Sequence, residues 1–421
     1  MINKGTRGRR SWPALVAVLG LAVSAAGCGA NDASDGESSA DTIKIGLVGP
    51  YSGALSTLGK AFRDGANLAV KNLQAEGVDI KVELVEGDDQ GTPEAGVTAV
   101  RQLLDRDQVD VLAGVYSSTV CEAVFPIVDQ ADVLFTPAAC ISIDKEKWGP
   151  KDWLFHAAVF DEHSAAAAVG LMDELDPTPR TVAILYADDV LGQGTHEKLM
   201  SALPDGGYDV VMEEAFDPTA KDHSAVLNKV EDVDPDVLMA AGYVDQLMLL
   251  TRQAKEQNIN VPAFLYPASG PADPQFRETL GADAEAIIGV QPWVAAAAYP
   301  ADENYPELFP SNQDWVAQFD AEYGYEPSFM GPLGYTIVTM YALAFDEARS
   351  TDVGELGKAL SELDIQTPLG PLHYQEYGDV KHQGLMEQVA FQIQGSEVVP
   401  LWPEEAAPAD IAAVYPHPGW R

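Results

Sequence analysis

The chain is poor in basic residues. It has 25 Lys and Arg residues against 65 Asp and Glu residues, which gives a formal net charge of −40 at pH 7. Nucleic-acid binding requires clustered Lys and Arg to neutralise phosphates, so this balance argues against a nucleic-acid partner. The acidity indicates either a solvated surface suited to a salty or crowded exterior or an attraction for a cationic ligand. The acidic residues are spread along the chain, which favours the solvated surface.

Motifs of catalytic and metal sites are also absent. The seven histidines form no HExxH motif, and there is no GxSxG elbow and no Walker loop. The glycines of GLVGPYSG follow an apolar run but lack the spacing of a dinucleotide loop. Asp88 and Asp89 could form a paired-carboxylate site, but at the end of a strand and before a helix they are more often structural. We therefore expect no metal, no cofactor and no enzymatic activity.

Long apolar runs are missing beyond the N-terminus, where residues 1–27 read as a signal peptide. A basic head is followed by an apolar stretch over 12–26 and by small residues, the order typical of secretory signals. The apolar stretch is short of the roughly 18 residues that cross a membrane, and no later stretch approaches that length. We therefore expect the rest of the chain to be soluble.

Cys28 directly follows the small residues, and this arrangement resembles the bacterial lipobox. The resemblance implies that the thiol receives a diacylglyceryl group and that cleavage makes Cys28 the new N-terminus. Ala25 stands where a leucine is more usual, so an ordinary signal peptide with an incidental cysteine remains open. Residues 28–42 are rich in Gly, Ser, Ala and Asp and predict a flexible tether. Together these segments predict an exported protein anchored to the outer face of the cell membrane.

Cysteine is scarce, with three residues in the whole chain. With Cys28 assigned to lipid, Cys121 and Cys140 remain, in a compartment where thiols oxidise. A disulfide between them would close a loop of about 20 residues and contribute on the order of 3 kcal/mol. Two buried free thiols are the alternative. Two cysteines without neighbouring histidines do not make a metal ligand set.

Short β-branched runs alternate with helical segments in two sets. In the first set, Thr92 is expected to cap a helix that has Pro93 at its first position, and Pro126 is expected within the first turn or two of a later helix. The first set is expected to contain strands over 43–49, 81–89, 109–115 and 132–138, with helices over 60–77, 93–104 and from 117 onward. Strands separated by helices of this length predict βαβ units and a parallel sheet.

The pattern then restarts with a second α/β set. Residues 190–194 are expected to form a loop before a helix, and segments near 371–374 and 387–394 are expected to form a closing antiparallel pair. The second set is expected to contain strands over 181–189, 209–216, 235–243 and 261–267, with helices over 164–175, 224–230, up to 254 and over 334–348. The fold class is therefore α/β, with two Rossmann-like lobes built on parallel sheets.

Candidate ligand-binding residues follow the strands of the first set. In open parallel sheets, ligands bind outside the carboxyl ends of the strands. The candidates are Tyr51 and Ser52 after the first strand, Tyr116, Ser117, Ser118 and Thr119 after the third, and Ala138, Ala139 and Cys140 after the fourth.

The chain resembles the branched-chain amino acid-binding family of periplasmic binding proteins, which have the type I Venus-flytrap fold. The resemblance covers residues 43–400 and depends on the order and spacing of IKIGLVGPYSG, GDDQGTPEAGVTAVRQLL, VDVLAGVYSST, VLFTPAA, LYADDVLGQG and LGPLHYQEYGD. It implies two lobes between which the chain crosses three times, near Ala158, Gly289 and Gln383. The implied boundaries are 43–158 plus 290–383 for the first lobe and 159–289 plus 384–421 for the second.

The family's ligand residues carry over only in part. The serine that binds an amino-acid carboxylate corresponds best to Ser118, with Ser117 one position away. A hydroxyl at a helix N-terminus suits an anion, although either serine could simply cap the helix. Backbone groups of the loop after the fourth strand correspond to Ala138, Cys140 replaces a threonine, and the aromatic residue of the second lobe matches Tyr243.

The sequence departs from the family at the subsite for the ligand's amine. The amine-binding carboxylate falls at 267–269, where no acid is present, and Leu58 and Leu191 replace aromatic residues. An ammonium removed from water needs a paired charge. Asp188, Asp189 or Asp245 are candidates to supply it. A ligand without an ammonium, such as an aromatic acid, a short-chain amide or a urea-like solute, therefore competes with a plain amino acid.

The resemblance implies a solute-binding lipoprotein of an ABC importer. The protein would close its two lobes over a small polar molecule and deliver it to a permease and ATPase complex. A receptor lipoprotein of the same fold that signals to a membrane sensor is the alternative.

Overall fold

The computed structural model describes residues 41–420 except 268–269, 386–387, 405–406 and 408–411. The predicted signal peptide, Cys28 and nearly all of the predicted tether lie outside the described residues. Within the described part, no helix combines the length and the apolar character needed to cross a membrane.

The first sheet has four parallel strands in the order β2-β1-β3-β4. Its central strand β1 pairs on both sides, so that Ile45 lies opposite Leu84 of β2 and Val111 of β3. The strands are β1 (Thr42–Gly49), β2 (Lys81–Asp88), β3 (Val111–Gly114) and β4 (Phe135–Pro137). Parallel pairing brings the carboxyl ends of all four strands to one edge, where the predicted site residues follow.

Helices cover both faces of this sheet because its strands are apolar on both sides. Ile43 and Ile45 belong to the apolar cluster that includes α1 and α11, whereas Val48 and Leu112 pack with α2 and α3. The helices of this lobe are α1 (Ser56–Ala75), α2 (Pro93–Arg101) with a π-helical turn (Gln102–Arg106), α3 (Ser118–Ala131), α4 (Lys145–Trp148), α10 (Asn312–Tyr323), α11 (Met330–Ala348) and α12 (Val353–Ser361). The predicted Thr92 cap is confirmed, since its hydroxyl accepts from the Ala95 N–H.

The second sheet has seven strands in the order β15-β14-β9-β8-β7-β5-β6. Its strands are β5 (Thr181–Ala187), β6 (Asp209–Phe216), β7 (Val237–Ala241), β8 (Ala263–Tyr266), β9 (Ile288–Gln291), β14 (Val389–Gln394) and β15 (Glu397–Trp402). Strands β5 to β9 are parallel, whereas β14 and β15 are antiparallel to their neighbours.

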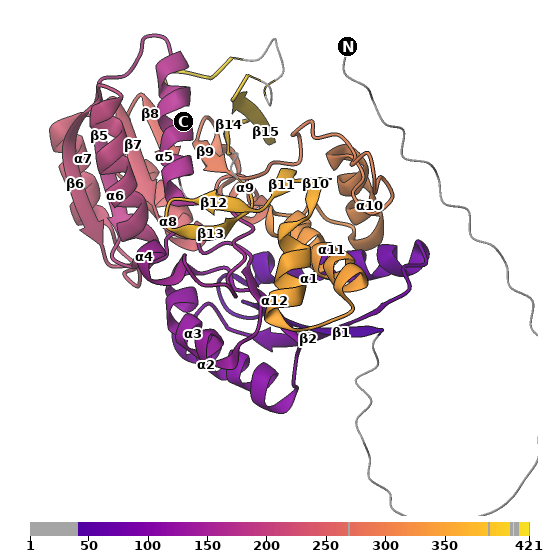
Figure 1. The fold of residues 1–421 in the computed structure, drawn as a ribbon. Coiled ribbons are helices and arrows are strands. Elements are labelled where there is room, and N and C mark those ends of the chain that lie inside the picture. The colour runs from indigo at the N-terminus through magenta and orange to yellow at the C-terminus, as the bar shows by residue number, and fades with distance from the viewer. Residues whose placement is uncertain (1–40, 268–269, 386–387, 405–406, 408–411, 421) are drawn as a thin grey trace, which may run out of the picture. The chain divides into compact units, whose positions relative to one another are not determined.

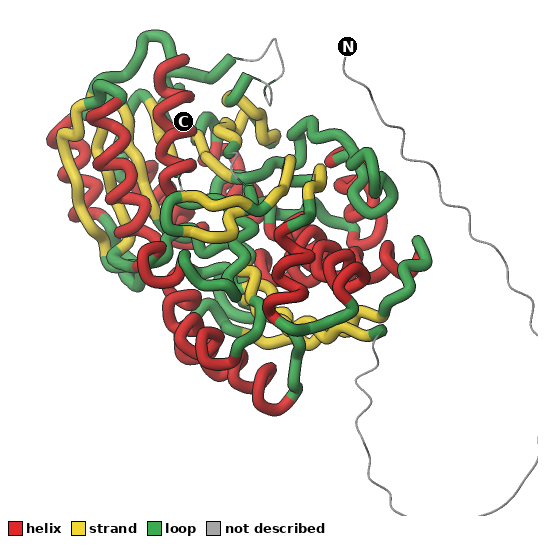
Figure 2. Tube along the Cα trace, viewed as in Figure 1, coloured by secondary structure: helices red, strands yellow, loops and turns green. Residues whose placement is uncertain are grey.

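The second sheet also carries helices on both faces (Figures 1 and 2). Val182 and Ile184 of β5 pack with α5 and α6, whereas Ala183 and Leu185 pack with α7 and α8. The helices are α5 (Asp161–Glu174), α6 (Val190–Asp205), α7 (Ser224–Val233), α8 (Val244–Glu256) and α9 (Pro274–Leu280), followed by a 3₁₀ turn (Gly281–Ala284). The predicted α/β class with two lobes is confirmed.

Three local predictions are wrong. Residues 190–194 open α6 instead of forming a loop, because the Asp189 carboxylate caps that helix and lets it begin early. Pro126 is the ninth residue of α3 and so lies in its third turn. The segments near 371–374 and 387–394 do not pair with each other.

Each of those two segments instead pairs within its own hairpin. β10 (Asp364–Thr367) pairs with β11 (Gly370–His373), and β14 pairs with β15. A further hairpin joins β12 (Gln375–Tyr377) to β13 (Val380–Gln383). Gly378 and Gly395 have positive φ in two of these turns, and such turns close short hairpins at little entropic cost.

Two segments that run between the sheets lie side by side. His156 pairs with Gln383 in an isolated parallel bridge, and the Gln383 amide donates to the carbonyls of Ala158 (2.6 Å) and Leu385 (2.5 Å). Residues 156–158 and 383–385 are therefore tied together. The exact lobe boundaries stay a prediction.

Candidate functional site

The N-terminus of α3 is an unneutralised positive helix end. Ser117 occupies the N-cap position, but its hydroxyl makes no capping hydrogen bond, and the first turn holds no acidic residue. The Thr119 hydroxyl is buried at this end and faces the Tyr243 phenol. Free N–H groups and the helix dipole favour a negative charge at such an end. The N-terminus of α3 therefore offers a local position for an anion, although the chain as a whole carries a net charge of −40.

Ser117 instead meets Tyr243 from the other lobe. The two hydroxyl oxygens are 2.8 Å apart and buried, and Tyr243 precedes α8 with its N–H donated to the Gln246 side chain (2.9 Å). Burial raises the pKa of Tyr243, and the negative charge of Asp189 raises it further. The Tyr243 phenol is therefore a neutral donor or acceptor between the lobes.

Aromatic rings flank this hydroxyl pair. The Tyr116 ring lies 5.6 Å from the Tyr243 ring and 6.2 Å from the Phe329 ring, measured between centroids. All three side chains are buried. The geometry joins polar hydroxyls to aromatic surface, the combination typical of sites for small organic molecules.

Of the three aspartates that could replace the missing amine-binding acid, Asp189 is the one whose charge acts on Tyr243. Its carboxylate accepts from the Gly192 N–H (2.9 Å) as the cap of α6, and burial raises its pKa. Asp245 contributes to that rise by its charge. Asp188 is exposed and accepts from the Gln193 side chain (2.7 Å). The position predicted to lack an acid, 267–269, is described only at Pro267.

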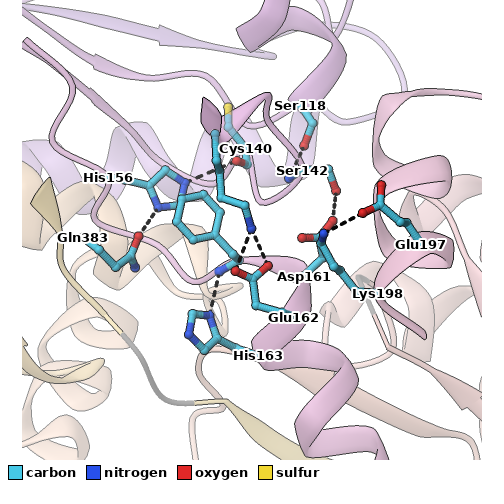
Figure 3. A network of polar contacts seen from close by, with 12 residues as sticks. Ser118, Cys140, Ser142, His156, Asp161, Glu162, His163, Glu197, Lys198 and Gln383 are labelled. Atoms are coloured by element: carbon cyan, nitrogen blue, oxygen red, sulfur yellow. Dashed lines mark hydrogen bonds and ion pairs between the residues drawn. The ribbon is translucent and has the colours of Figure 1, made fainter. Parts of the chain in front are cut away.

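Ser118 takes part in a separate polar chain between the lobes (Figure 3). Its hydroxyl accepts from the Ser142 N–H (3.3 Å), and the Ser142 hydroxyl donates to Asp161 (2.6 Å) and approaches the carbonyl of Leu191 (3.4 Å). Burial raises the pKa of Asp161 to about 6. Ser117 is thus the serine that meets Tyr243, and Ser118 holds the loop after β4.

The loop after β4 is fixed to the first lobe. The N–H groups of Ala138, Ala139 and Cys140 donate to the carbonyls of residues 114, 115 and 116 at 2.8, 3.4 and 3.3 Å. A disulfide joins Cys140 to Cys121 in the first turn of α3. The amides of this loop are therefore engaged within the lobe.

The buried His156 side chain contacts the loop after β4 at the Cys140 carbonyl (Figure 3). Its ring nitrogens lie 3.2 Å from the Cys140 carbonyl and 3.0 Å from the Gln383 side chain. Burial lowers the pKa of His156 to about 4, so the ring is neutral. The chain segments that pass between the lobes thus contact the wall of the candidate site.

Tyr51 does not reach the hydroxyl pair. Its hydroxyl donates to the Leu47 carbonyl (3.2 Å) and its N–H donates to Asp88 (3.0 Å), which also binds the Ser52 hydroxyl (2.6 Å). The structure therefore places Tyr51 and Ser52 against the end of β1.

Sequence reasoning included Thr119 among the candidates but missed Phe329 as an aromatic neighbour of Tyr116 and Asp273 as a buried acid. An Asp-Pro pair at 273–274 signals a helix cap, but nothing in the sequence shows that this carboxylate is buried. In the described ranges, no group of three or more His, Cys, Asp or Glu side chains gathers to hold a metal ion.

Comparison with known proteins agrees with this geometry. A family model for periplasmic binding proteins matches residues 42–396. The chain is 26% identical over 347 residues to a leucine-, isoleucine-, valine-, threonine- and alanine-binding protein of Pseudomonas aeruginosa, covering 82% of this chain and 88% of the relative. It is 25% identical over 348 residues to the Leu/Ile/Val-binding protein of Escherichia coli K12, covering 81% and 89%.

Solved structures share the fold. A leucine-binding protein from Thermotoga maritima superposes with a TM-score of 0.74 at 20% identity, covering 88% of this chain and all of that one. A solute-binding protein of an ABC transporter from R. palustris, solved with benzoate, has a TM-score of 0.71 at 18% identity, with coverage of 88% and 100%. These likenesses confirm the type I periplasmic binding protein fold. The chain belongs to the periplasmic binding protein family.

Proposed function

We propose that this chain is the extracellular solute-binding lipoprotein of an ABC importer. It captures a small carboxylate, either an amino acid or a related carboxylate or amide, and delivers it to a permease. The observation that carries the proposal is the N-terminus of α3, where the Ser117 hydroxyl faces Tyr243 and no acidic residue lies in the first turn.

The ligand's carboxylate docks at this helix end. The hydroxyls of Ser117 and Thr119 donate to it, and the helix dipole supplies the favourable potential. The matched relatives and structures support this anchor, because their names and titles give leucine-like amino acids and benzoate as ligands. Those two ligand classes share a carboxylate and differ in the ammonium.

An ammonium, where the ligand carries one, has two sources of negative charge near this end. The Ala138 carbonyl, in the loop after β4 whose N–H groups donate within the first lobe, is the first of them. Asp189 acts electrostatically on the same hydroxyl pair. Tyr116 and Phe329 cover the apolar part of the ligand.

Lobe closure completes the capture. The bond between Ser117 and Tyr243 joins the lobes, so a ligand at the α3 N-terminus exchanges this bond for its own contacts with both residues. Closure depends on the ligand only as far as the ligand binds the closed state better than the open one. The closed form is then the form that a permease recognises.

The test is calorimetric titration of the purified protein with leucine, benzoate and short amides, after a thermal-shift screen. Ser117→Ala removes one donor to a charged acceptor, worth about 1.5–3 kcal/mol, so carboxylate affinity falls by about 10- to 150-fold. Ser201→Ala, at an exposed position of α6, is the matched control and leaves affinity unchanged. Equal affinities for the Ser117→Ala variant and the unmodified chain would overturn the anchoring role.

The lipid anchor is tested separately. Cys28→Ala removes the thiol that would carry the diacylglyceryl group, so the exported protein should leave the membrane fraction and appear in the soluble extracellular fraction. Retention of that variant on the membrane would contradict the anchor without affecting ligand binding.

A further inference from the structure

A cavity of about 450 Å³ lies between the two lobes. One wall comes from α1 and residues 323–328, and the other from α9 with the residue before it. Two contacts join these walls: the Thr57 and Gln275 side chains meet at 2.6 Å, and Arg277 pairs with Glu326 at 2.7 Å. The cavity is therefore built by both lobes.

Two buried oxygen atoms on its walls make no hydrogen bond to the described residues. Asp273 is 3% exposed and Ser328 is 6% exposed, and both line the cavity. Oδ1 of Asp273 accepts from the Gln275 N–H (2.7 Å), but Oδ2 has no partner, and neither has Oγ of Ser328. A buried polar atom without a hydrogen-bond partner is destabilising, so these two atoms indicate a group that enters the cavity and donates to them.

The charge and the rings of the cavity favour a cation. Glu278 and Glu326 join Asp273 on the walls, against Lys60 as the basic residue among them. Lys60 is already engaged, since its ammonium lies 2.6 Å from Asp64 and 3.6 Å from the Tyr325 ring centroid. Acidic oxygens beside tyrosine rings attract organic cations.

Packed aromatic rings connect the wall of the cavity to the proposed carboxylate site. Ser328 directly precedes Phe329, whose ring packs on Tyr116, and Tyr116 in turn packs on Tyr243. Burial also raises the pKa of Asp273 to about 6, with Glu278 and Glu326 adding to the rise and Arg277 opposing it. A bound cation would relieve that penalty by pairing with the carboxylate.

We propose that this cavity is a cation subsite, in which Asp273 and Ser328 bind an organic ammonium group of a ligand whose carboxylate lies at the α3 N-terminus. This proposal rests on the proposed function. It assigns to Asp273 the recognition of an ammonium that is separated from the carboxylate by several bonds, and it makes the protein selective for ligands that carry both groups.

The experiment compares straight-chain ω-amino carboxylates, from 4-aminobutanoate to 8-aminooctanoate, with their parent carboxylates by calorimetric titration of the full chain. At least one amino carboxylate should bind about tenfold or more tightly than its parent. Asp273→Asn should abolish that advantage and leave the parent's affinity unchanged, because Asn keeps the oxygen that caps α9. Ser328→Ala should reduce the advantage in part.

Asp232→Asn, an exposed acid outside the cavity, is the charge-matched control and should retain the full advantage. Thermal melts of each variant show that it is folded. If the parents bind through Ser117 but no amino carboxylate exceeds its parent, or if the advantage survives Asp273→Asn, the subsite is refuted and the proposed function stands. If neither series binds, the proposed function fails and the subsite fails with it.

Discussion

The disulfide between Cys121 and Cys140 gives the sharpest test of how the candidate site is held. It joins the first turn of α3 to the loop after β4, and both cysteines are buried. The two positions are separated by 19 residues. The chain-entropy relation for a loop of that size gives about 3 kcal/mol of stabilisation, through restriction of the unfolded chain.

The perturbation is a cycle of three variants: Cys121→Ala, Cys140→Ala and the double variant. If the bridge acts as one unit, each single substitution breaks it completely. Each single variant should then lose about 3 kcal/mol of unfolding free energy, and the double variant should lose little more than either single variant. Two independent buried thiols would instead give small losses that add.

The assay is urea unfolding of each variant under non-reducing conditions, with the unmodified chain measured with and without a reductant. Reduction should lower the stability of the unmodified chain to that of the variants and leave the variants unchanged. Additive losses in the cycle, or indifference of the unmodified chain to the reductant, would refute the reasoning. Because the bridge fixes the wall beside Ser117, the variants should also bind carboxylates more weakly in the titration described above.

Three further predictions concern packing, titration and the segments between the lobes. Gly65→Ala should cost about 2–3 kcal/mol of unfolding free energy, because its Cβ would lie 1.9 Å from the Gly331 carbonyl of α11, whereas Gly357→Ala meets nothing closer than 3.5 Å and should be neutral or stabilising. Asp89 is buried with one oxygen unpartnered, and burial raises its pKa to about 7, so its contribution to stability is present below pH 4 and is lost as pH rises to 7. Asp89→Asn should therefore flatten the pH dependence of unfolding between pH 4 and 7, and an unchanged profile would refute this assignment. Gln383→Met keeps the length of the side chain but leaves the Ala158 and Leu385 carbonyls without their donor, so a loss of about 2–4 kcal/mol is expected in urea melts.

The fold could be predicted because its signals are local and periodic. Short β-branched runs that alternate with helical segments predicted the strands of the two sheets. The Thr92-Pro93 pair predicted a helix start, which the structure confirms. The errors have physical causes. Asp189 sits in a run that contains glycines, and its capping bond to the Gly192 N–H decides in favour of helix there.

Strand pairing could not be read from the sequence in the same way. The segments near 371–374 and 387–394 both alternate apolar and polar residues, which favours a strand in each but does not show which partner that strand has. The partner was set by the nearer strand across a short turn, as in the β14–β15 hairpin closed at Gly395.

The site was only partly accessible from the sequence. The position after β3 was predicted because a hydroxyl at a helix start after a parallel strand favours an anion. Which of Ser117 and Ser118 faces the other lobe depends on tertiary packing, and the structure gives that role to Ser117. Asp273 was not predicted, because an Asp before a Pro is typical of an exposed helix cap. Its burial arises where α9 meets α1 and residues 323–328.

The Ser117–Tyr243 bond also limits which ligands can be captured. A neutral hydrogen bond of this kind contributes about 0.5–1.5 kcal/mol, and a ligand that inserts between the two hydroxyls must at least replace it. A neutral amide that gains a single hydrogen bond recovers about as much free energy as the lost Ser117–Tyr243 bond contributed. A carboxylate gains about 1.5–3 kcal/mol for each hydrogen bond that it accepts, and the buried Thr119 hydroxyl offers a second donor beside Ser117. The same contact that joins the lobes therefore selects against weak neutral ligands and favours anions, at a helix end whose first turn carries no acidic residue.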